Sequence, residues 1–272
     1  MDRPEDSLPV TRRAGPIIIL LTIAAAVIGP VLVPHDAIAQ DLPMRLNGPS
    51  WSHPLGMDEL GRDLLARLLM GARISLFVGV SVVGVSALVG TIIGALAGYL
   101  GGVADAIIGR VMDVLLAFPG ILLAIALVAV LGPSLRNVVL ALVTIGWVGY
   151  ARLVRGQVLK IRELDYVQAI RAQGASLARV LRAHVIPATF SAVSVQATLG
   201  MAGAIIGEAS LSFLGLGVQP PTASWGTMLD AGRSHLFDAP HLTIVPGLAI
   251  ALLVLGFNFT GDALRDRLDP RL

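Results

Sequence analysis

The sequence lacks cysteine and holds a single lysine, Lys160, among its 272 residues. Without cysteine the chain can form no disulfide bond, thiolate metal site or cysteine nucleophile. Leu159 precedes the lysine, so the Gly-Lys-Ser/Thr element of a phosphate-binding P-loop is absent, and no His-Glu-x-x-His motif of a zinc protease occurs. We therefore predict no catalytic residue, no cofactor and no metal site in this chain, and any ATP-driven work must come from another protein.

Charged residues are also scarce. They make up 14% of the chain, hydrophobic residues make up 55%, and the mean hydropathy is +0.80. No ordinary soluble domain has this balance, so the sequence predicts an all-α integral protein of the lipid bilayer. The formal net charge is only +2, and the pI near 9.5 reflects arginines in loops. Nucleic acid is not an expected partner, because its binding requires a clustered, exposed basic face.

Six apolar stretches predict a polytopic protein with six transmembrane helices. They cover residues 17–33, 74–100, 105–131, 135–150, 189–217 and 242–260, and the third is expected to continue through Phe118 and Pro119. We divide the chain into a cytoplasmic tail (1–14), a first transmembrane helix retained as an anchor (15–33), an extracytoplasmic segment (34–72), a core of five further transmembrane helices (73–262) and a cytoplasmic tail (263–272).

The distribution of arginine predicts the orientation. The longest charged interval is loop 151–188, in which Arg152, Arg155, Lys160, Arg162, Arg171, Arg179 and Arg182 outnumber Glu163 and Asp165. Basic residues concentrate in short cytoplasmic loops, so this loop is predicted to lie inside the cell. Arg12 and Arg13 place the N-terminus on the same side, and six spans return the C-terminus there. Segments 34–70 and 218–241 are predicted to be outside.

Within loop 151–188, apolar or small residues recur at helical spacing at Val167, Ile170, Gly174, Leu177 and Leu181. The spacing predicts a short helix with one apolar face, on which Gly174 leaves a bare patch suited to docking of another protein. A loop helix that rests on lipid headgroups is the alternative.

Two spans carry glycines at intervals of three or four residues: Gly90, Gly94 and Gly98 on the second, and Gly200, Gly203 and Gly207 on the fifth. Small residues let helix backbones approach closely in lipid. We therefore expect tight helix packing at these positions rather than a pore lining.

Charged residues near the membrane boundaries are interpreted as structural. A solvated interfacial face is predicted before the second span, formed by Asp58, Glu59, Arg62 and Asp63. A metal site is not expected there, because no further ligands gather at a suitable spacing. Arg110 and Asp113 are placed for an i,i+3 ion pair at the cytoplasmic boundary.

Glu208 is the one acid deep within a predicted span. An isolated carboxylate at membrane depth is costly, so it must face the bundle interior, water or a partner group. Two interpretations stay open: a hydrogen-bonded structural acid, or a residue lining a transport pathway together with Ser210 and Ser212.

The order Gln168-Ala169, Gly174, Ile186-Pro187 resembles the signature of ABC-importer permeases. In that family Glu-Ala-Ala is followed by a glycine four residues later and by a hydrophobic-Pro pair. Ile170 replaces the second Ala, and Gln168 replaces the Glu, which keeps the side-chain length and hydrogen-bonding capacity but loses the charge.

Four ordered blocks extend the likeness over most of the chain after residue 50: HPLGMDELGRDLLARLLMGARISL (53–76), GYARLVRGQVLKIRELDYVQAIRAQGAS (149–176), EASLSFLGLGVQPPTASWGTML (208–229) and FNFTGDALRDRLDPRL (257–272). Together they resemble the dipeptide/oligopeptide/nickel permeases, in particular the DppC/OppC type of subunit.

This resemblance implies the type I ABC importer permease fold in a prokaryotic cell membrane, with residues 73–262 as the ABC transmembrane type-1 core. It implies three kinds of partner: a homologous DppB/OppB-type permease, two cytoplasmic ATP-binding subunits or one fused, which would bind ATP and Mg, and an extracytoplasmic solute-binding protein. The implied ATPase-coupling residues are Tyr166, Gln168, Ala169, Gly174, Ala175, Ser176 and Pro187.

Alternatives remain for the transported substrate and for the class of transport protein. The resemblance implies import of di- or oligopeptides, and related permeases move nickel or glutathione instead. We favour peptide over nickel, because none of the five histidines lies in a predicted span and cysteine is absent. A secondary transporter or channel is the alternative from another class, and it would be favoured by discontinuous spans and several intramembrane ionisable groups.

Overall fold

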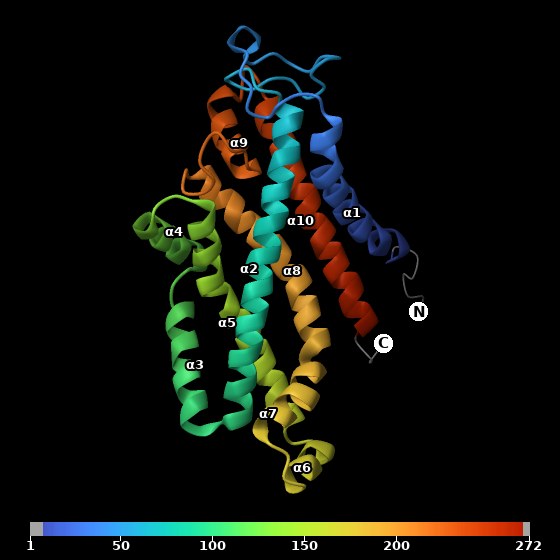
Figure 1. Ribbon diagram of the computed structural model, residues 1–272, viewed down its shortest axis with the longest axis vertical. Coiled ribbons are helices and arrows are strands. Elements are labelled where there is room, and N and C mark those ends of the chain that lie inside the picture. Colours follow the sequence, from blue (N-terminus) through green and yellow to red (C-terminus); the bar gives the residue numbers. More distant parts are fainter. Residues whose placement is uncertain (1–7, 269–272) are drawn as a thin grey trace, which may run out of the picture.

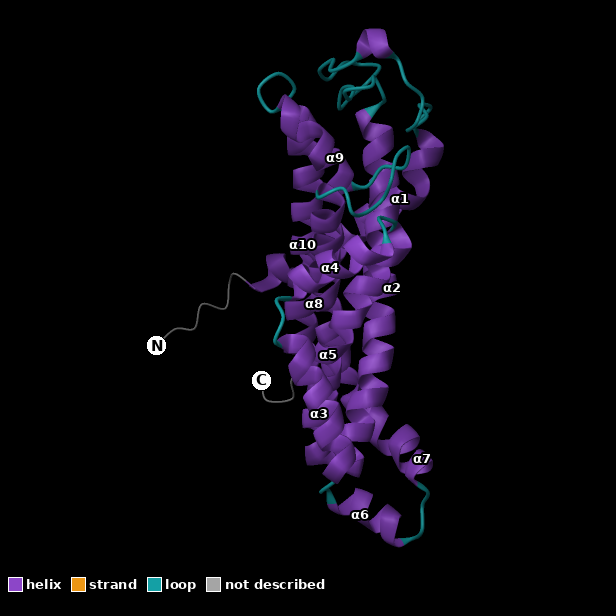
Figure 2. Ribbon diagram, turned by 90° about the vertical axis from the view of Figure 1, so that its left-hand side faces the viewer, coloured by secondary structure: helices purple, strands orange, loops and turns teal. Residues whose placement is uncertain are grey.

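The computed structural model describes residues 8–268, which form an elongated helical bundle (Figure 1). The long helices are α1 (Leu8–Leu32), α2 (Leu64–Leu100), α5 (Leu135–Ile161), α8 (Ile186–Phe213) and α10 (His241–Leu268). The short ones are α3 (Gly102–Leu116), α4 (Gly120–Leu131), α6 (Asp165–Ala172), α7 (Leu177–Val180) and α9 (Trp225–Gly232), joined by 3-10 turns at Leu42–Met44 and Arg233–His235 and a π turn at Leu181–Val185. Across residues 8–268 there is no strand, only a single bridge between Met57 and Asp63 (Figure 2).

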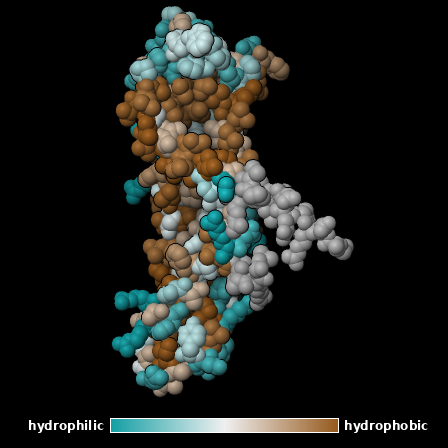
Figure 3. All heavy atoms as spheres, turned by 90° about the vertical axis from the view of Figure 1, so that its right-hand side faces the viewer, coloured by the Kyte–Doolittle hydropathy of each residue, from teal (hydrophilic) through white to brown (hydrophobic). Residues whose placement is uncertain are grey.

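Among the described residues, five helices are long and apolar enough to cross a membrane, and the bent pair α3–α4 makes a sixth crossing if it counts as one span. The predicted all-α, six-span architecture is confirmed in this form. Figure 3 shows a broad apolar band on one face of the bundle, beneath a hydrophilic cap. Such a band suits contact with lipid.

The third predicted span differs from the expectation, because it is not one continuous helix. The chain bends by 85° between α3 and α4. Pro119 lacks a backbone N–H and disfavours helical geometry at Phe118, so α3 ends before this pair and α4 begins after it. The prediction of an uninterrupted helix was therefore wrong at the proline.

α2 begins ten residues before the predicted second span, at Leu64. The Asp63 side chain caps the helix by accepting a hydrogen bond from the backbone N–H of Ala66 at 2.7 Å. Its 37 residues correspond to about 55 Å at the usual helical rise, more than the hydrocarbon core of about 30 Å. α2 therefore reaches beyond the membrane and links its two sides.

α2 packs closely against α5 along the predicted glycine groove. A Cβ on Gly90 would come within 2.6 Å of the Tyr150 Cβ, and one on Gly94 would meet the Ala151 backbone, with its Cα at 2.9 Å. A Cβ on Gly98 would lie 2.9 Å from the Arg155 carbonyl oxygen. The expectation of tight packing is confirmed for the second span.

The two ends of the bundle are built differently. Residues 33–63 and α9 cover one end, and α6 and α7 form the other (Figure 1). α9 is fastened to α2 by a hydrogen bond of 2.9 Å from Trp225 Nε1 to the Leu68 carbonyl oxygen. The predicted outer segments thus share one end, opposite the predicted cytoplasmic loop. Of the predicted tails, residues 1–7 and 269–272 lie outside the described residues.

Candidate functional site

A cavity of about 430 Å³ lies between α2, α4, α5 and α8. This volume is in the range of small-ligand pockets, about 300–1,000 Å³. Gly200, Gly203 and Gly207 line its α8 wall. A Cβ on Gly203 would meet nothing within 4 Å, so this glycine borders open space rather than the packed contact predicted for it.

A few polar groups interrupt the apolar cavity wall, namely Ser86, Tyr150, Gln196 and Ser210. The Ser86 hydroxyl is buried and has no hydrogen-bond partner among the described residues. Tyr150 donates to the Gln196 carbonyl oxygen at 3.4 Å. Sequence reasoning singled out Ser210 alone, although a search for polar residues within the apolar spans would also have found Ser86 and Gln196.

Glu208 does not line this cavity, and neither does Ser212. Both are fully buried, and the Ser212 hydroxyl donates to Glu208 Oε1 at 2.6 Å. Glu208 Oε2 has no hydrogen-bond partner among the described side chains. Of the three predicted pathway residues, the geometry places only Ser210 at the cavity and favours the structural interpretation of Glu208.

At the opposite end from α9, α6 packs its apolar face against its own chain. Val167 is fully buried, and it clusters with Val154 and Val158 of α5 and with Val180 and Val185 near the start of α8. The predicted face was therefore correct at Val167, Ile170 and Leu181, which serve packing within the chain, but Gly174 and Leu177 are exposed. α6 also ends at Ala172, so the apolar residues from Val167 to Leu181 do not lie on a single helix.

The predicted coupling residues lie on the outer side of this end. Tyr166, Gln168, Ala169, Gly174, Ser176 and Pro187 are all exposed, and Ala175 is half-buried. Nothing within residues 8–268 covers this surface. We call Tyr166, Gln168, Ala169, Gly174, Ala175 and Ser176 the α6 surface.

Gly174 closes α6 with a left-handed turn. Its φ is +84°, its N–H donates to the Arg171 carbonyl oxygen at 2.9 Å, and the Ala175 N–H donates to Ile170 at 3.3 Å. This pair of hydrogen bonds is the Schellman motif, in which glycine is favoured. The backbone alone thus explains a glycine here, and the surrounding space is open, because a Cβ would meet nothing within 4 Å.

Two ion pairs join α3 to α5 near the same end. Arg152 pairs with Asp113, and Arg155 Nη2 donates to Asp105 Oδ2 at 2.7 Å. The predicted partner of Asp113 was Arg110, which is exposed and makes no ion pair in the described structure. The prediction was wrong because α5 lies close enough for Arg152 to reach Asp113 across the bundle.

At the other end, the predicted solvated face is a buried charge network. Asp58 Oδ2 accepts from Arg62 Nε at 2.7 Å and lies 3.3 Å from Arg67 Nε. Asp58, Arg62, Arg67 and Asp63 are all buried. Only Glu59 fits the prediction, with a side chain that is 37% exposed. The error arose because the loop folds back over the start of α2 and shields these groups from water.

Comparison with known proteins identifies relatives whose similarity extends over almost the whole chain. A family model described as "Binding-protein-dependent transport system inner membrane component" matches residues 90–272. The glutathione transport system permease protein GsiD of Pectobacterium atrosepticum is 49% identical over 260 residues, which are 95% of this chain and 86% of that protein. The dipeptide transport system permease protein DppC of Alkalihalophilus pseudofirmus is 44% identical over 258 residues, which are 95% and 85% of the two chains.

Proposed function

Because this chain belongs to the family of binding-protein-dependent transport system inner membrane components and is a permease subunit of an ABC importer, we propose that it carries small peptides through the cavity between α2, α4, α5 and α8. Glutathione and dipeptides are the first candidates, since similar permeases are named for their transport. The cavity supports this choice: its mostly apolar wall with a few hydroxyl and amide groups suits a small peptide better than a bare metal ion.

The observation that supports this proposal is that α5 and α8 connect the cavity to α6. Both helices line the cavity, and both contribute to the cluster that holds α6. A displacement of α6 by a partner would therefore be passed to the cavity wall through Val167 and its contacts.

The partners we propose are a second, homologous permease, cytoplasmic ATPases that bind the α6 surface, and an extracytoplasmic binding protein. Both termini would then be cytoplasmic.

Uptake in a strain that lacks this chain tests the substrate. We expect uptake of labelled glutathione, of a labelled dipeptide, or of both to fall to background, and to return when the chain is restored. Uptake of labelled nickel should not change. A loss confined to nickel would overturn the peptide proposal, and purification of the tagged chain from its native membrane without any ATPase would contradict the importer assembly.

Gly174→Asn tests the α6 surface. Asparagine tolerates a positive φ, so the turn should persist while a side chain projects into the open space. We expect a roughly tenfold loss of ATPase retention, equivalent to about 1.4 kcal/mol, with normal yield of the chain. The measurement is the amount of ATPase that co-purifies with each variant.

Gly215→Asn is the matched control. Gly215 also has a positive φ, +75°, open space around it and the same pair of turn hydrogen bonds, but it follows α8 at the opposite end of the bundle. It should retain the ATPases. Full retention and normal uptake with Gly174→Asn would show that Gly174 is outside the interface and would favour a loop helix lying on lipid headgroups.

A further inference from the structure

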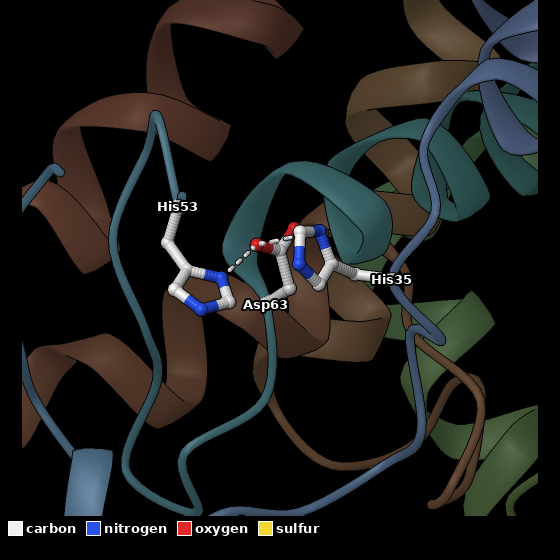
Figure 4. A group of neighbouring side chains, drawn as sticks. All are labelled: His35, His53 and Asp63. Carbon is white, nitrogen blue, oxygen red and sulfur yellow. Dashed lines mark hydrogen bonds and ion pairs between the residues drawn. The ribbon is translucent and has the colours of Figure 1, made fainter. Parts of the chain in front are cut away.

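Three potential metal ligands meet at the end of the molecule opposite α6. His35 lies on the loop after α1, His53 on the loop before α2, and Asp63 at the N-cap of α2. One ligand atom from each lies within 4.8 Å of the other two. Figure 4 shows the Asp63 carboxylate between the two imidazole rings. The residues are 18 and 10 positions apart, so no sequence motif signals the group.

We propose that His35, His53 and Asp63 form a site for a divalent transition-metal cation of the zinc type. Two imidazoles and one carboxylate are ligands that zinc accepts, with bonds of about 2.0–2.2 Å. Ligand atoms on a tetrahedral ion at that distance are about 3.4 Å apart. His53 Nδ1 is 2.8 Å from Asp63 Oδ2 and His35 Nδ1 is 3.9 Å from it, so each histidine nitrogen lies within about half an ångström of the expected spacing from the carboxylate oxygen. The two histidines must also close to that spacing from a separation of at most 4.8 Å.

The carboxylate is already oriented for this role. Asp63 Oδ1 accepts the hydrogen bond from the Ala66 N–H, which leaves Oδ2 directed at both histidines. Hydrogen bonds of this kind hold metal ligands in position. The His53 backbone is also held, because its N–H donates to Ser50 Oγ and its carbonyl oxygen accepts from the Ser50 N–H. Two of the three ligands therefore need little rearrangement.

A hydrogen-bonded helix cap without metal is the competing explanation. It accounts for His53, which lies at hydrogen-bond distance from Asp63, but not for His35, whose 3.9 Å separation is too long for a hydrogen bond. His35 nevertheless packs with its ring centroid 4.6 Å from that of His53. The positive end of the α2 dipole makes cation binding less favourable by up to about 1 kcal/mol. This cost is small beside the free energy of three metal–ligand bonds. Nitrogen ligands favour zinc over calcium or magnesium.

The site also has an open side. The His35 side chain is 37% exposed and that of His53 is 16% exposed, whereas Asp63 is 3% exposed. Water can therefore supply a fourth ligand. A bound cation would connect the loop after α1, the loop before α2 and the first turn of α2.

The test is zinc titration of the purified full-length chain in nanodiscs, carrying a tag without histidine. The absence of cysteine removes thiolate background. We expect one zinc per chain, measured by competition with a chromophoric chelator, and no binding of calcium at the same concentration. His35→Gln should weaken zinc binding roughly tenfold or more. Without zinc it should leave thermal stability unchanged, since His35 Nδ1 lies 3.9 Å from Asp63 Oδ2, too far for a hydrogen bond.

His235→Gln is the matched control, because His235 lies in the 3-10 turn after α9 and faces Glu59 at 3.8 Å instead of the cluster. It should bind zinc as the wild type does. His53→Gln should weaken binding at least as much as His35→Gln. Failure to bind one equivalent of zinc, or equal affinity of the His35→Gln variant and the wild type, would overturn the metal site and leave only the hydrogen-bonded cap.

Discussion

Asp58→Ala is expected to lower the free energy of unfolding by about 3–5 kcal/mol, because it removes the carboxylate that two buried arginines share. The side chains of Arg62 and Arg67 are 7% and 6% exposed, so water does not compensate for the lost partner. Asp58 Oδ1 also accepts the backbone N–H groups of Leu60 and Arg62, each at 2.9 Å. Alanine leaves these donors without an acceptor as well.

Glu59→Ala is the matched control for this substitution. The two acids are adjacent, but the Glu59 side chain is 37% exposed and lies 3.8 Å from His235 Nε2. A surface change of this kind is expected to stay within about 0.5 kcal/mol. Denaturation midpoints of the two purified variants provide the comparison. Equal midpoints would mean that the Asp58 network does not stabilise this end of the bundle.

The segment between α1 and α2 shows the limit of prediction from the sequence. Its acids and arginines are spaced irregularly, and an irregular segment with balanced charge is typical of solvated loops. Their burial depends on how the loop closes over α2, for example on the contact between Arg67 Nη1 and the Ala37 carbonyl oxygen at 3.3 Å. The same loop closure brings His35 to Asp63. No local pattern encodes such distant contacts.

Helix packing was easier to predict from the sequence, because the spacing of apolar residues indicates which face of a helix is buried. It identified the apolar face of α6 correctly, but periodicity cannot tell a contact within the chain from a contact with a partner. At Gly174 the same limit applies, since a glycine required by a positive φ and a glycine required by a docking surface look identical in sequence. The cavity was missed for a further reason: it is formed by residues of four separate helices, and α4 reaches it only after the bend at Pro119.

The groove between α2 and α5 allows the sharpest test of the fold itself. Any side chain at Gly94 must occupy the space of the Ala151 backbone, where a Cβ would lie 2.9 Å from Cα and 3.0 Å from the carbonyl carbon. A neighbouring side chain could rotate away, but a helix backbone cannot, so α2 and α5 must separate. Their separation would also loosen the packing at Gly90 and Gly98 on either side.

Gly94→Leu is therefore expected to destabilise the chain by about 3 kcal/mol, at the upper end of the range for overpacking. Gly84→Leu is the matched control, because Gly84 lies on the same helix, is exposed, and would meet nothing within 4 Å with a Cβ. Leucine has the higher helix propensity, so the control should be neutral or slightly stabilising in the isolated chain. The fraction of each variant that elutes as folded protein after extraction in detergent, followed over a temperature series, measures the difference. If Gly94→Leu elutes and melts like Gly84→Leu, then α2 and α5 do not depend on backbone contact, and the cavity that they help to line is not held open by this groove.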